Sequence, residues 1–422
     1  MGHSAAGRQP SAVLKNLLFL ASLLALGFAF FAPARNNPFW HSGDYEYLLQ
    51  ALRIDGDWRQ IFARAPHQTF QPLVNLVFYV EFLLFDVNPT GYYAFNVVVH
   101  AVNAFLVYFL VLTLLRDRTI AIVSGVLFAL AVGNYGKAVM VVSGVGDLVI
   151  TMLTLLTMIF YARNELAERG QAWTRNFVLC MLFFALSLLS KATSFSLLGC
   201  MLAFNLFFRE QTGRRLFDSN FTIIAVAAFA VLVLKLALLP SFPGASDFVI
   251  SWTVPKNVAA YLVRMVFPIQ YSALVTHSGG AVQFIYQLAT EIRILIFFCI
   301  VSYSVFGFVF GNRVIRFFIV WTYITVAPFC FFRWPVDWLN IRYLYLVSVG
   351  FVMILASATV LGSRLLAHHR FRRFVPYAIP LAFALLSQFV VLKLDGNYEF
   401  KANSPRLDTV KAEFRAARAE RR

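Results

Sequence analysis

Acidic residues are few in this chain of 422 residues, and one of them, Asp44, lies where a carboxylate could do chemistry at a membrane surface. It follows the first long apolar run, about residues 14–31, inside the aromatic segment Phe39-Trp40-His41-Ser42-Gly43-Asp44-Tyr45. A carboxylate within hydrogen-bonding distance of a hydroxyl group can take its proton as the oxygen attacks an electrophile. Asp44 is therefore a candidate general base, which favours an enzyme over a simple channel. The alternative is an acid that caps a helix or stands in a solvated loop.

Other charged residues beside apolar runs are candidates for the rest of such a site. Asp147 precedes an apolar run, where it either caps that helix or orients an acceptor or a metal ion. Lys191 lies between two apolar runs, so its ammonium group either snorkels outward or binds an anion. Arg333 and Arg342 flank a short tryptophan-containing segment and are either interfacial anchors or phosphate-binding groups, since a guanidinium can bind two oxygens at once.

The composition indicates which elements must position these residues. The chain is 60% hydrophobic and 17% aromatic, with 13% charged residues, which is more apolar than the core of a soluble protein of this length requires. Apolar runs of about 15 to 24 residues recur along the whole length, close to the roughly 20 residues that a helix needs to span a bilayer. The predicted fold class is therefore all-α, a polytopic transmembrane helical protein.

Basic clusters between the apolar runs predict the topology, because loops rich in Lys and Arg stay on the cytoplasmic side. We expect two further apolar stretches, 70–86 and about 258–275, to be helices against the outer face, and counting both as spans would raise the total from eleven to thirteen. Residues 1–394 then form one transmembrane domain and residues 395–422 a basic tail. Within this tail, Lys401–Arg422 resembles a solvated basic helix, and contact with anionic lipid is the alternative. The eleven expected spans are residues 14–33, 93–115, 119–134, 148–163, 177–190, 192–208, 220–239, 290–310, 317–332, 343–362 and 375–394.

This topology gathers the unusual ionisable residues on the outer side, and such residues at membrane depth usually mark a site because they are costly in lipid. The large first outer loop, about residues 34–92, carries the juxtamembrane helix and Asp44. The later outer loops supply Lys137 and Asp147 (about 134–147), His277 beside Gly279-Gly280 (about 240–289), and Arg333 and Arg342 (333–342).

The charge and the cysteines exclude other classes of protein. The chain has 36 Lys and Arg against 20 Asp and Glu, a formal charge of +16, but the basic residues form short clusters between apolar runs, and no nucleic-acid recognition module is visible. We expect an uncleaved signal anchor at the N-terminus and a satisfied core histidine at His100. The cysteines all fall inside apolar runs, and we expect buried side chains there instead of disulfides or metal ligands: Cys180, Cys200, Cys299 and Cys330.

Short motifs also follow one another in a fixed order along residues 14–362. They are Gly43-Asp44 after the first span, Gln71-Pro72-Leu73 at a helix start, Pro89 to Asn96 with His100, Ser143-Gly144-Val145-Gly146-Asp147-Leu148, Leu189-Ser190-Lys191 and Arg342-Tyr343-Leu344-Tyr345. This series resembles the GT-C class of membrane glycosyltransferases, close in pattern to the protein O-mannosyltransferases and their tetratricopeptide-containing relatives. Gly43 replaces the first acid of the pair found in relatives, Gly146 stands where relatives often carry Arg, and no tetratricopeptide repeats follow residue 394.

The resemblance implies transfer of a sugar from a polyprenyl-phosphate donor to a hydroxyl group of a protein, lipid or glycan on the non-cytoplasmic side. Asp44 would be the base, and Asp147 would be a second catalytic carboxylate that orients the acceptor or a metal ion. Arg342, Arg333 and Lys191 would hold the donor phosphate. Because phosphate leaves readily, no general acid is needed, unlike in glycoside hydrolysis, and backside attack would invert the anomeric centre. Substrate-binding candidates are His277, Gln71 and Lys137. The sequence fixes no cofactor, and a divalent metal stays an open alternative.

Two other functional classes stay open. A transporter or flippase of lipid-linked sugars would also need Arg and Lys in a polar cavity, but such proteins often contain internal repeats, and the sequence has none that we detect. A non-catalytic scaffold on the same fold is the third hypothesis, because Gly43 lacks a carboxylate. In each case we expect an integral multi-pass protein, of the bacterial inner membrane with its active face outward, or of the endoplasmic reticulum in a eukaryote.

Overall fold

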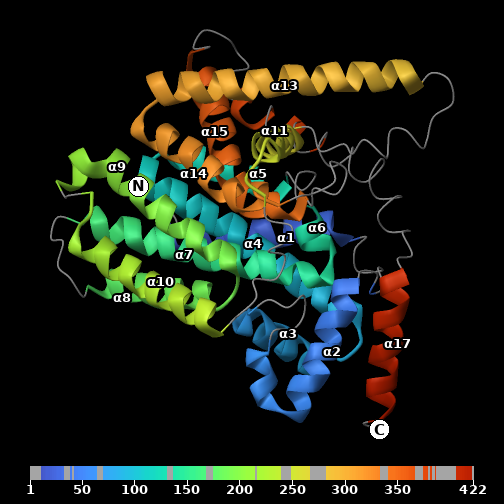
Figure 1. Ribbon diagram of the computed structural model, residues 1–422. Coiled ribbons are helices and arrows are strands. Elements are labelled where there is room, and N and C mark those ends of the chain that lie inside the picture. The colour runs from blue at the N-terminus through green and yellow to red at the C-terminus, as the bar shows by residue number, and fades with distance from the viewer. Residues whose placement is uncertain are drawn as a thin grey trace, which may run out of the picture.

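The structure, a computed structural model, is a bundle of α-helices (Figure 1). It describes residues 11–32, 39, 42–63, 70–130, 136–167, 174–213, 216–238, 249–266, 282–332, 341–365, 374–378, 381–382, 385 and 405–420. The principal helices within these ranges are α1 (Ala12–Phe30), α2 (Ser42–Gly56), α3 (Pro72–Phe85), α4 (Pro89–Leu115), α5 (Arg118–Leu130), α6 (Gly136–Met140), α7 (Val145–Glu165), α8 (Arg175–Leu188), α9 (Ser196–Thr212), α10 (Ser219–Leu238), α11 (Thr253–Val266), α13 (Val282–Phe310), α14 (Arg313–Cys330), α15 (Leu344–Leu365) and α17 (Pro405–Ala419).

Four short 3-10 helices join these elements: η2 (Trp58–Phe62), η4 (Val142–Gly144), η5 (Ala192–Phe195) and η8 (Ile341–Tyr343). The described residues contain no β-strand, and seven of the helices are long and apolar enough to cross a membrane. The prediction of an all-α polytopic protein is therefore confirmed.

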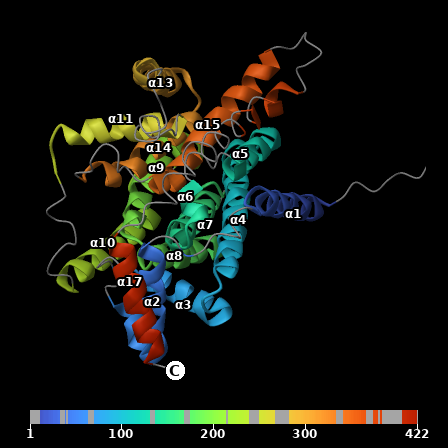
Figure 2. The same ribbon diagram turned by 90° about the vertical axis from the view of Figure 1, so that its right-hand side faces the viewer.

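The bundle is organised around α4, which packs against α1, α5 and α7, while α8 covers α7. A second pair, α14 and α15, contacts α9 and α5 and places both halves of the chain in one core (Figures 1 and 2). Gly350 lets α15 approach α14 closely, because a Cβ there would collide with Thr322 and the Phe318 carbonyl. Trp321 is fully buried in the same interface, and its Nε1 donates to the Leu346 carbonyl at 3.3 Å.

The span assignments agree only in part with the helices. The seven candidate spans lie at α1, α4, η4–α7, η5–α9, α13, α14 and α15, and each overlaps an expected span. Three further expected spans, 119–134, 177–190 and 220–239, coincide with shorter apolar helices, and most of the last, 375–394, lies outside the described residues. Asp117 marks the start of the first of these three by capping α5: its Oδ1 accepts from Thr119 N–H at 3.0 Å. The total of eleven spans stays a prediction.

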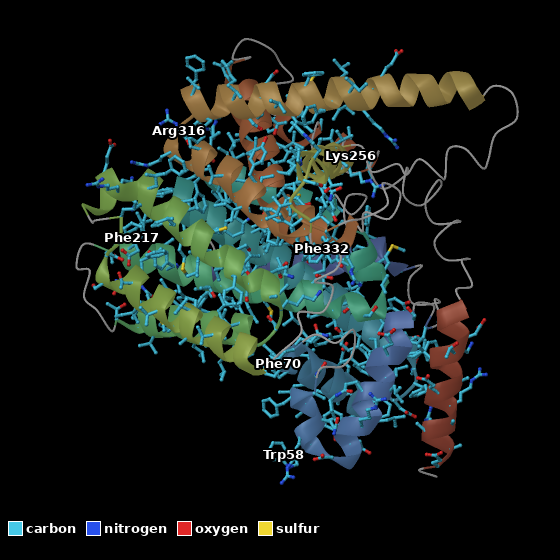
Figure 3. All side chains as sticks on the ribbon, viewed as in Figure 1. Trp58, Phe70, Phe217, Lys256, Arg316 and Phe332 are labelled. Atoms are coloured by element: carbon cyan, nitrogen blue, oxygen red, sulfur yellow. The ribbon has the colours of Figure 1, made fainter. Side chains whose placement is uncertain are left out.

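A smaller helical unit stands beside the bundle and consists of α2, η2, α3 and α17 (Figures 1 and 2). Helix α3 begins at Pro72, where a missing backbone N–H costs nothing, and is only 14 residues long. At the far end of α2, the Trp58 side chain points away from the protein and is 65% exposed (Figure 3). The expected helix at 70–86 is thus observed as α3, and its place on the outer face stays a prediction. The other expected stretch, 258–275, begins within α11, and its residues from 267 onward lie outside the described part.

Two expectations about side chains need correction. The C-terminal segment forms a helix, but it is not solvated on all sides: α17 packs along α2 and buries Val410 and Phe414. Only a narrow side of α17 is hydrophobic, so most of its sequence is polar and the segment resembles a solvated helix. Three of the cysteines are buried and unpaired as expected, whereas Cys299 is exposed, because it stands on α13, most of whose described surface faces away from the bundle.

Candidate active site

An ion cluster forms where the first turn of α7 meets the segment after α8 and the helix η8. Asp147, in that first turn, accepts a hydrogen bond at Oδ1 from Lys191 Nζ at 2.6 Å, and its Oδ2 lies 3.6 Å from Arg342 Nε. The Asp147, Lys191 and Arg342 side chains are 9%, 19% and 16% exposed. One carboxylate therefore faces two cations in a mostly buried setting, and the cluster carries one surplus positive charge.

Asp147 is not a helix cap, although its place in the sequence suited that alternative. The residue before α7 is Gly144, and no side chain caps the helix there. Asp147 Oδ2 has no hydrogen-bond partner within the described part of the chain. The carboxylate thus serves the two cations, and the N-terminal end of the α7 dipole further stabilises its negative charge.

Gly146 makes room for this arrangement. A Cβ at Gly146 would lie 3.0 Å from Lys191 Cε and 3.3 Å from Val74 Cγ1, so the lysine stem crosses the α7 backbone where a side chain would otherwise stand. The segment that carries Lys191 is fixed to α3, because Leu73 N–H donates to the Leu189 carbonyl at 3.1 Å. The departure from the motif of relatives, Gly in place of Arg, therefore coincides with a lysine that reaches the same acid from another helix end.

A buried polar network holds the start of α15 at Tyr345, three residues after Arg342. His100 Nε2 lies 3.1 Å from the Ala129 carbonyl, which can only accept, so Nε2 carries the proton. His100 Nδ1 must then accept from the Tyr345 hydroxyl at 2.8 Å, and Asn103 Nδ2 donates both to that hydroxyl (3.2 Å) and to the Leu148 carbonyl (2.9 Å). The network ties α15 to α4, α5 and α7, and the prediction of a satisfied core histidine at His100 is confirmed.

Asp44 lies in the first turn of α2 and is fully buried. Its Oδ1 accepts from the backbone N–H of Ser143 at 2.8 Å, in η4, four residues before Asp147. The two acids come from separate segments of the sequence, and the structure brings both to the short η4–α7 segment. Asp44 is therefore anchored beside the ion cluster and is not a solvated loop acid.

Gln71 contributes through a tyrosine. Its Nε2 donates to the Tyr47 hydroxyl at 2.6 Å, and both side chains are buried. Burial raises the pKa of the Tyr47 hydroxyl above its ordinary 10.0, the nearby Arg342 guanidinium opposes this rise, and the Asp147 carboxylate adds to it. Tyr47 therefore stands near the cluster as a neutral hydroxyl group, one turn along α2 from Asp44.

Three of the predicted site residues are not tested by these contacts. Arg333 and His277 lie outside the described residues, and Lys137 lies in α6, where the structure describes the backbone but not this side chain. Other members of the site were missed by sequence reasoning: Tyr47, Tyr345 and the Ser143 backbone. Tyr345 was in a quoted motif, so its presence there was a usable signal, whereas Tyr47 shows no pattern that separates it from other tyrosines.

The ion cluster does not suit a divalent metal. The oxygens of Asp147 face an ammonium and a guanidinium group, which compete with a metal for the same charge. Elsewhere within the described ranges, no group of three or more His, Cys, Asp or Glu side chains could hold a metal ion.

Comparison with known proteins relates this arrangement to membrane glycosyltransferases. Residues 67–238 match the family model of dolichyl-phosphate-mannose-protein mannosyltransferases. The Drosophila melanogaster protein O-mannosyl-transferase Tmtc1 is 29% identical over 197 residues, which are 44% of this chain and 22% of that protein. Mouse TMTC1 is 30% identical over 148 residues, or 33% of this chain and 16% of the relative. The chain thus matches less than a quarter of the length of these relatives.

The fold is shared over a longer stretch. The Archaeoglobus fulgidus oligosaccharyltransferase AglB, solved with an inhibitory peptide and a dolichol-phosphate, superposes with a TM-score of 0.50 at 14% identity, over 95% of this chain and 56% of that one. The apo form of the A. fulgidus oligosaccharyltransferase gives 0.51 at 13% identity, over 94% and 59%. The resemblance to GT-C membrane glycosyltransferases that the motifs predicted is therefore confirmed, in sequence for part of the chain and in fold for nearly all of it.

Proposed function

We propose that this protein transfers a glycosyl group from a polyprenyl-phosphate-linked donor to a hydroxyl group of an acceptor, on the non-cytoplasmic side of the membrane. The observation that carries the proposal is the cluster of Asp147, Lys191 and Arg342, with Asp44 anchored to the same η4–α7 segment. The matching family model, whose description names a dolichyl-phosphate-linked sugar, and the dolichol-phosphate complex of AglB support a donor of this chemical class.

The surplus positive charge is what a donor phosphate needs. Lys191 and Arg342 together carry two positive charges, and Asp147 neutralises one of them. When the donor binds, its phosphate loses water and forms hydrogen bonds to the two cationic side chains. The same cations stabilise the negative charge that develops on the leaving phosphate as the bond between the sugar and the phosphate breaks. Asp147 keeps both cations in place, and its oxygen without a hydrogen-bond partner among the described residues can accept from a sugar or acceptor hydroxyl.

Asp44 is the proposed base. Its carboxylate takes the proton of the acceptor hydroxyl, the hydroxyl oxygen bonds to the anomeric carbon, and the electron pair of the carbon–oxygen bond leaves with the polyprenyl phosphate. Attack from the face opposite the leaving group inverts the anomeric configuration. The hydrogen bond from the Ser143 N–H fixes one carboxylate oxygen, so the direction of the other oxygen is set by α2 and η4 together.

The names of the relatives support a protein as the acceptor. The matching family model and the O-mannosyl-transferase relatives are named for transfer to protein, which favours a protein hydroxyl over a lipid or a glycan. None of the relatives named above is a transporter, so the flippase alternative gains no support from them. For the membrane itself, the bacterial inner membrane and the endoplasmic reticulum both stay compatible with this function.

The test reconstitutes the full chain in proteoliposomes with a panel of polyprenyl-phosphate sugars, each labelled in the sugar, and a serine- and threonine-containing peptide as acceptor. We expect one donor to lose its sugar to the peptide and to release polyprenyl phosphate in equal amount. Movement of intact donor between leaflets without any transfer would replace this function by that of a flippase.

A further inference from the structure

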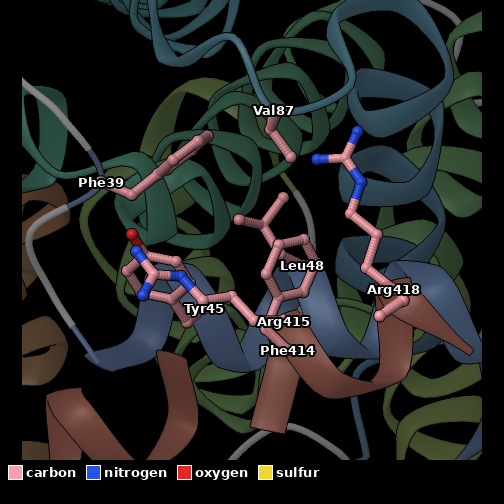
Figure 4. Close-up of a pocket in the computed structure, with 8 residues that line it drawn as sticks. Phe39, Tyr45, Leu48, Val87, Phe414, Arg415 and Arg418 are labelled. Atoms are coloured by element: carbon pink, nitrogen blue, oxygen red, sulfur yellow. The ribbon is translucent and has the colours of Figure 1, made fainter. Parts of the chain in front are cut away.

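A pocket of about 430 Å³ opens between α2 and α17, and none of its lining residues belongs to the ion cluster (Figure 4). Its wall is apolar and aromatic: Tyr45 and Leu48 come from α2, Phe414 from α17, and Phe39 and Val87 from the segments before α2 and after α3. The pocket exists because α17 packs on α2, with the rings of Phe414 and Tyr45 6.0 Å apart.

The rim of this pocket is cationic. Arg415 and Arg418 stand three residues apart on α17, so both face the pocket from the same side of the helix (Figure 4). Arg418 is held by Asp86, with 2.6 Å between Nη2 and Oδ2, whereas among the described residues no carboxylate lies within ion-pair distance of Arg415. The Arg415 guanidinium is near the Tyr45 hydroxyl, the buried Asp44 carboxylate acts on it less strongly, and Lys411 Nζ lies 5.8 Å from the centre of the Tyr45 ring. The rim therefore has excess positive charge.

An exposed apolar stripe on α3 leads toward the same place. Leu76, Val80, Leu83 and Leu84 are 40%, 45%, 59% and 70% exposed, and their spacing of four, seven and eight residues puts them on one face of the helix. The stripe ends three residues before Val87 of the pocket wall. Helix α3 is apolar nearly all round, because its polar side chains Asn75 and Glu81 are both buried. At 14 residues it is shorter than a bilayer-spanning helix, and its exposed apolar face is suited to contact with lipid chains.

We infer that this pocket binds the headgroup of an anionic phospholipid, with the phosphate under Arg415 and the start of the acyl chains along Phe414, Leu48 and Val87. A soluble anion would use only the cations and leave the apolar wall unoccupied. A zwitterionic lipid such as phosphatidylcholine would bring a quaternary ammonium group together with its phosphate, and the cations at the rim repel that group. A phospholipid in the interface beside α3 satisfies both parts. The pocket shares no residue with the ion cluster, although its Tyr45 directly follows Asp44, and the inference does not depend on glycosyl transfer.

The experiment titrates the purified full-length protein in detergent with phosphatidylglycerol and with phosphatidylcholine of the same chains, and counts bound lipid by native mass spectrometry. Arg415→Gln removes the cation, Arg415→Lys keeps its charge, and Ala419→Phe fills the end of the pocket without changing charge. The matched control is Arg53→Gln, which removes an exposed cation on α2 that does not line the pocket. The unfolding midpoint of each variant is measured alongside.

We expect one phosphatidylglycerol to bind at least tenfold more tightly than phosphatidylcholine. Arg415→Gln should weaken it by about fivefold, as expected for one interfacial cation. Arg415→Lys and Arg53→Gln should bind nearly as the native protein does, and Ala419→Phe should bind less. The inference is overturned if Ala419→Phe binds natively, if Arg53→Gln costs as much as Arg415→Gln, or if soluble glycerol phosphate binds as tightly as the lipid. Loss of donor turnover in any variant does not bear on this outcome.

Discussion

Substituting Lys191 by Met tests whether the ion cluster holds the donor phosphate. The substitution keeps most of the apolar stem that crosses Gly146, and removes the ammonium group that lies 2.6 Å from Asp147 Oδ1. The formal charge of the cluster then falls from one surplus positive charge to zero, since Arg342 alone remains to match the carboxylate.

The size of the effect follows from this change. A hydrogen bond to a charged group contributes about 1.5–3 kcal/mol, so the dissociation constant of the donor should rise by roughly 10- to 150-fold. The protein should still fold, because Arg342 stays 3.6 Å from Asp147 and continues to compensate its charge. Substituting the acid acts mainly on the fold: Asp147→Asn leaves two cations without their carboxylate partner, so it should destabilise the protein by about 3 kcal/mol.

The assay is a titration of the purified protein with the polyprenyl-phosphate sugar identified in proteoliposomes, read by intrinsic fluorescence. A thermal unfolding scan of each variant, recorded alongside, shows whether it is folded. Lys256→Met is the matched control, because Lys256 is an exposed lysine on α11 outside the cluster (Figure 3). Native donor affinity in a folded Lys191→Met protein would refute the assignment of the phosphate to this cluster.

Three further changes probe the surroundings of the site. Tyr345→Phe leaves His100 Nδ1 without its donor and should cost about 1–3 kcal/mol of unfolding free energy by denaturant titration, and no loss would contradict the network. Gly146→Val should displace Lys191 and weaken donor binding as Lys191→Met does. A native donor affinity would count against the packing of Lys191 on Gly146. Burial raises the pKa of the Glu81 carboxyl well above 4.5, so the folded state keeps a proton that the unfolded chain loses, and stability falls as the pH rises through that value. Glu81→Gln should therefore raise the unfolding midpoint at pH 8 but not at pH 4, and an equal midpoint at pH 8 would show that the carboxylate carries no penalty.

The site could be predicted in part because its charged residues are exceptions in an apolar chain. Asp44, Asp147, Lys191 and Arg342 each stand at the end of an apolar run, and the positive-inside rule placed those ends on one side. The hydrogen bond that holds Asp44 was not predictable, because its donor is the backbone N–H of Ser143, and every residue except proline supplies such a group.

The rest of the fold was harder to read for physical reasons. Helix α17 has a polar sequence, and only Val410 and Phe414 turn it into a packed element. Helices α5 and α8 were expected to be spans, but they are 13 and 14 residues long, short of the roughly 20 residues that a bilayer crossing needs. Hydrophobicity predicted that these helices exist, but it did not decide whether each one crosses the membrane.

The most direct test of the proposed function is sugar transfer by Asp44→Asn. Asparagine can still accept the hydrogen bond from Ser143 N–H, so the variant should keep the native unfolding midpoint and donor affinity. Without a base, its turnover should fall by about 10²- to 10⁴-fold, whereas Asp55→Asn, the same change at an exposed acid near the other end of α2, should keep native turnover. Native turnover by a folded Asp44→Asn protein would contradict the mechanism proposed for this site.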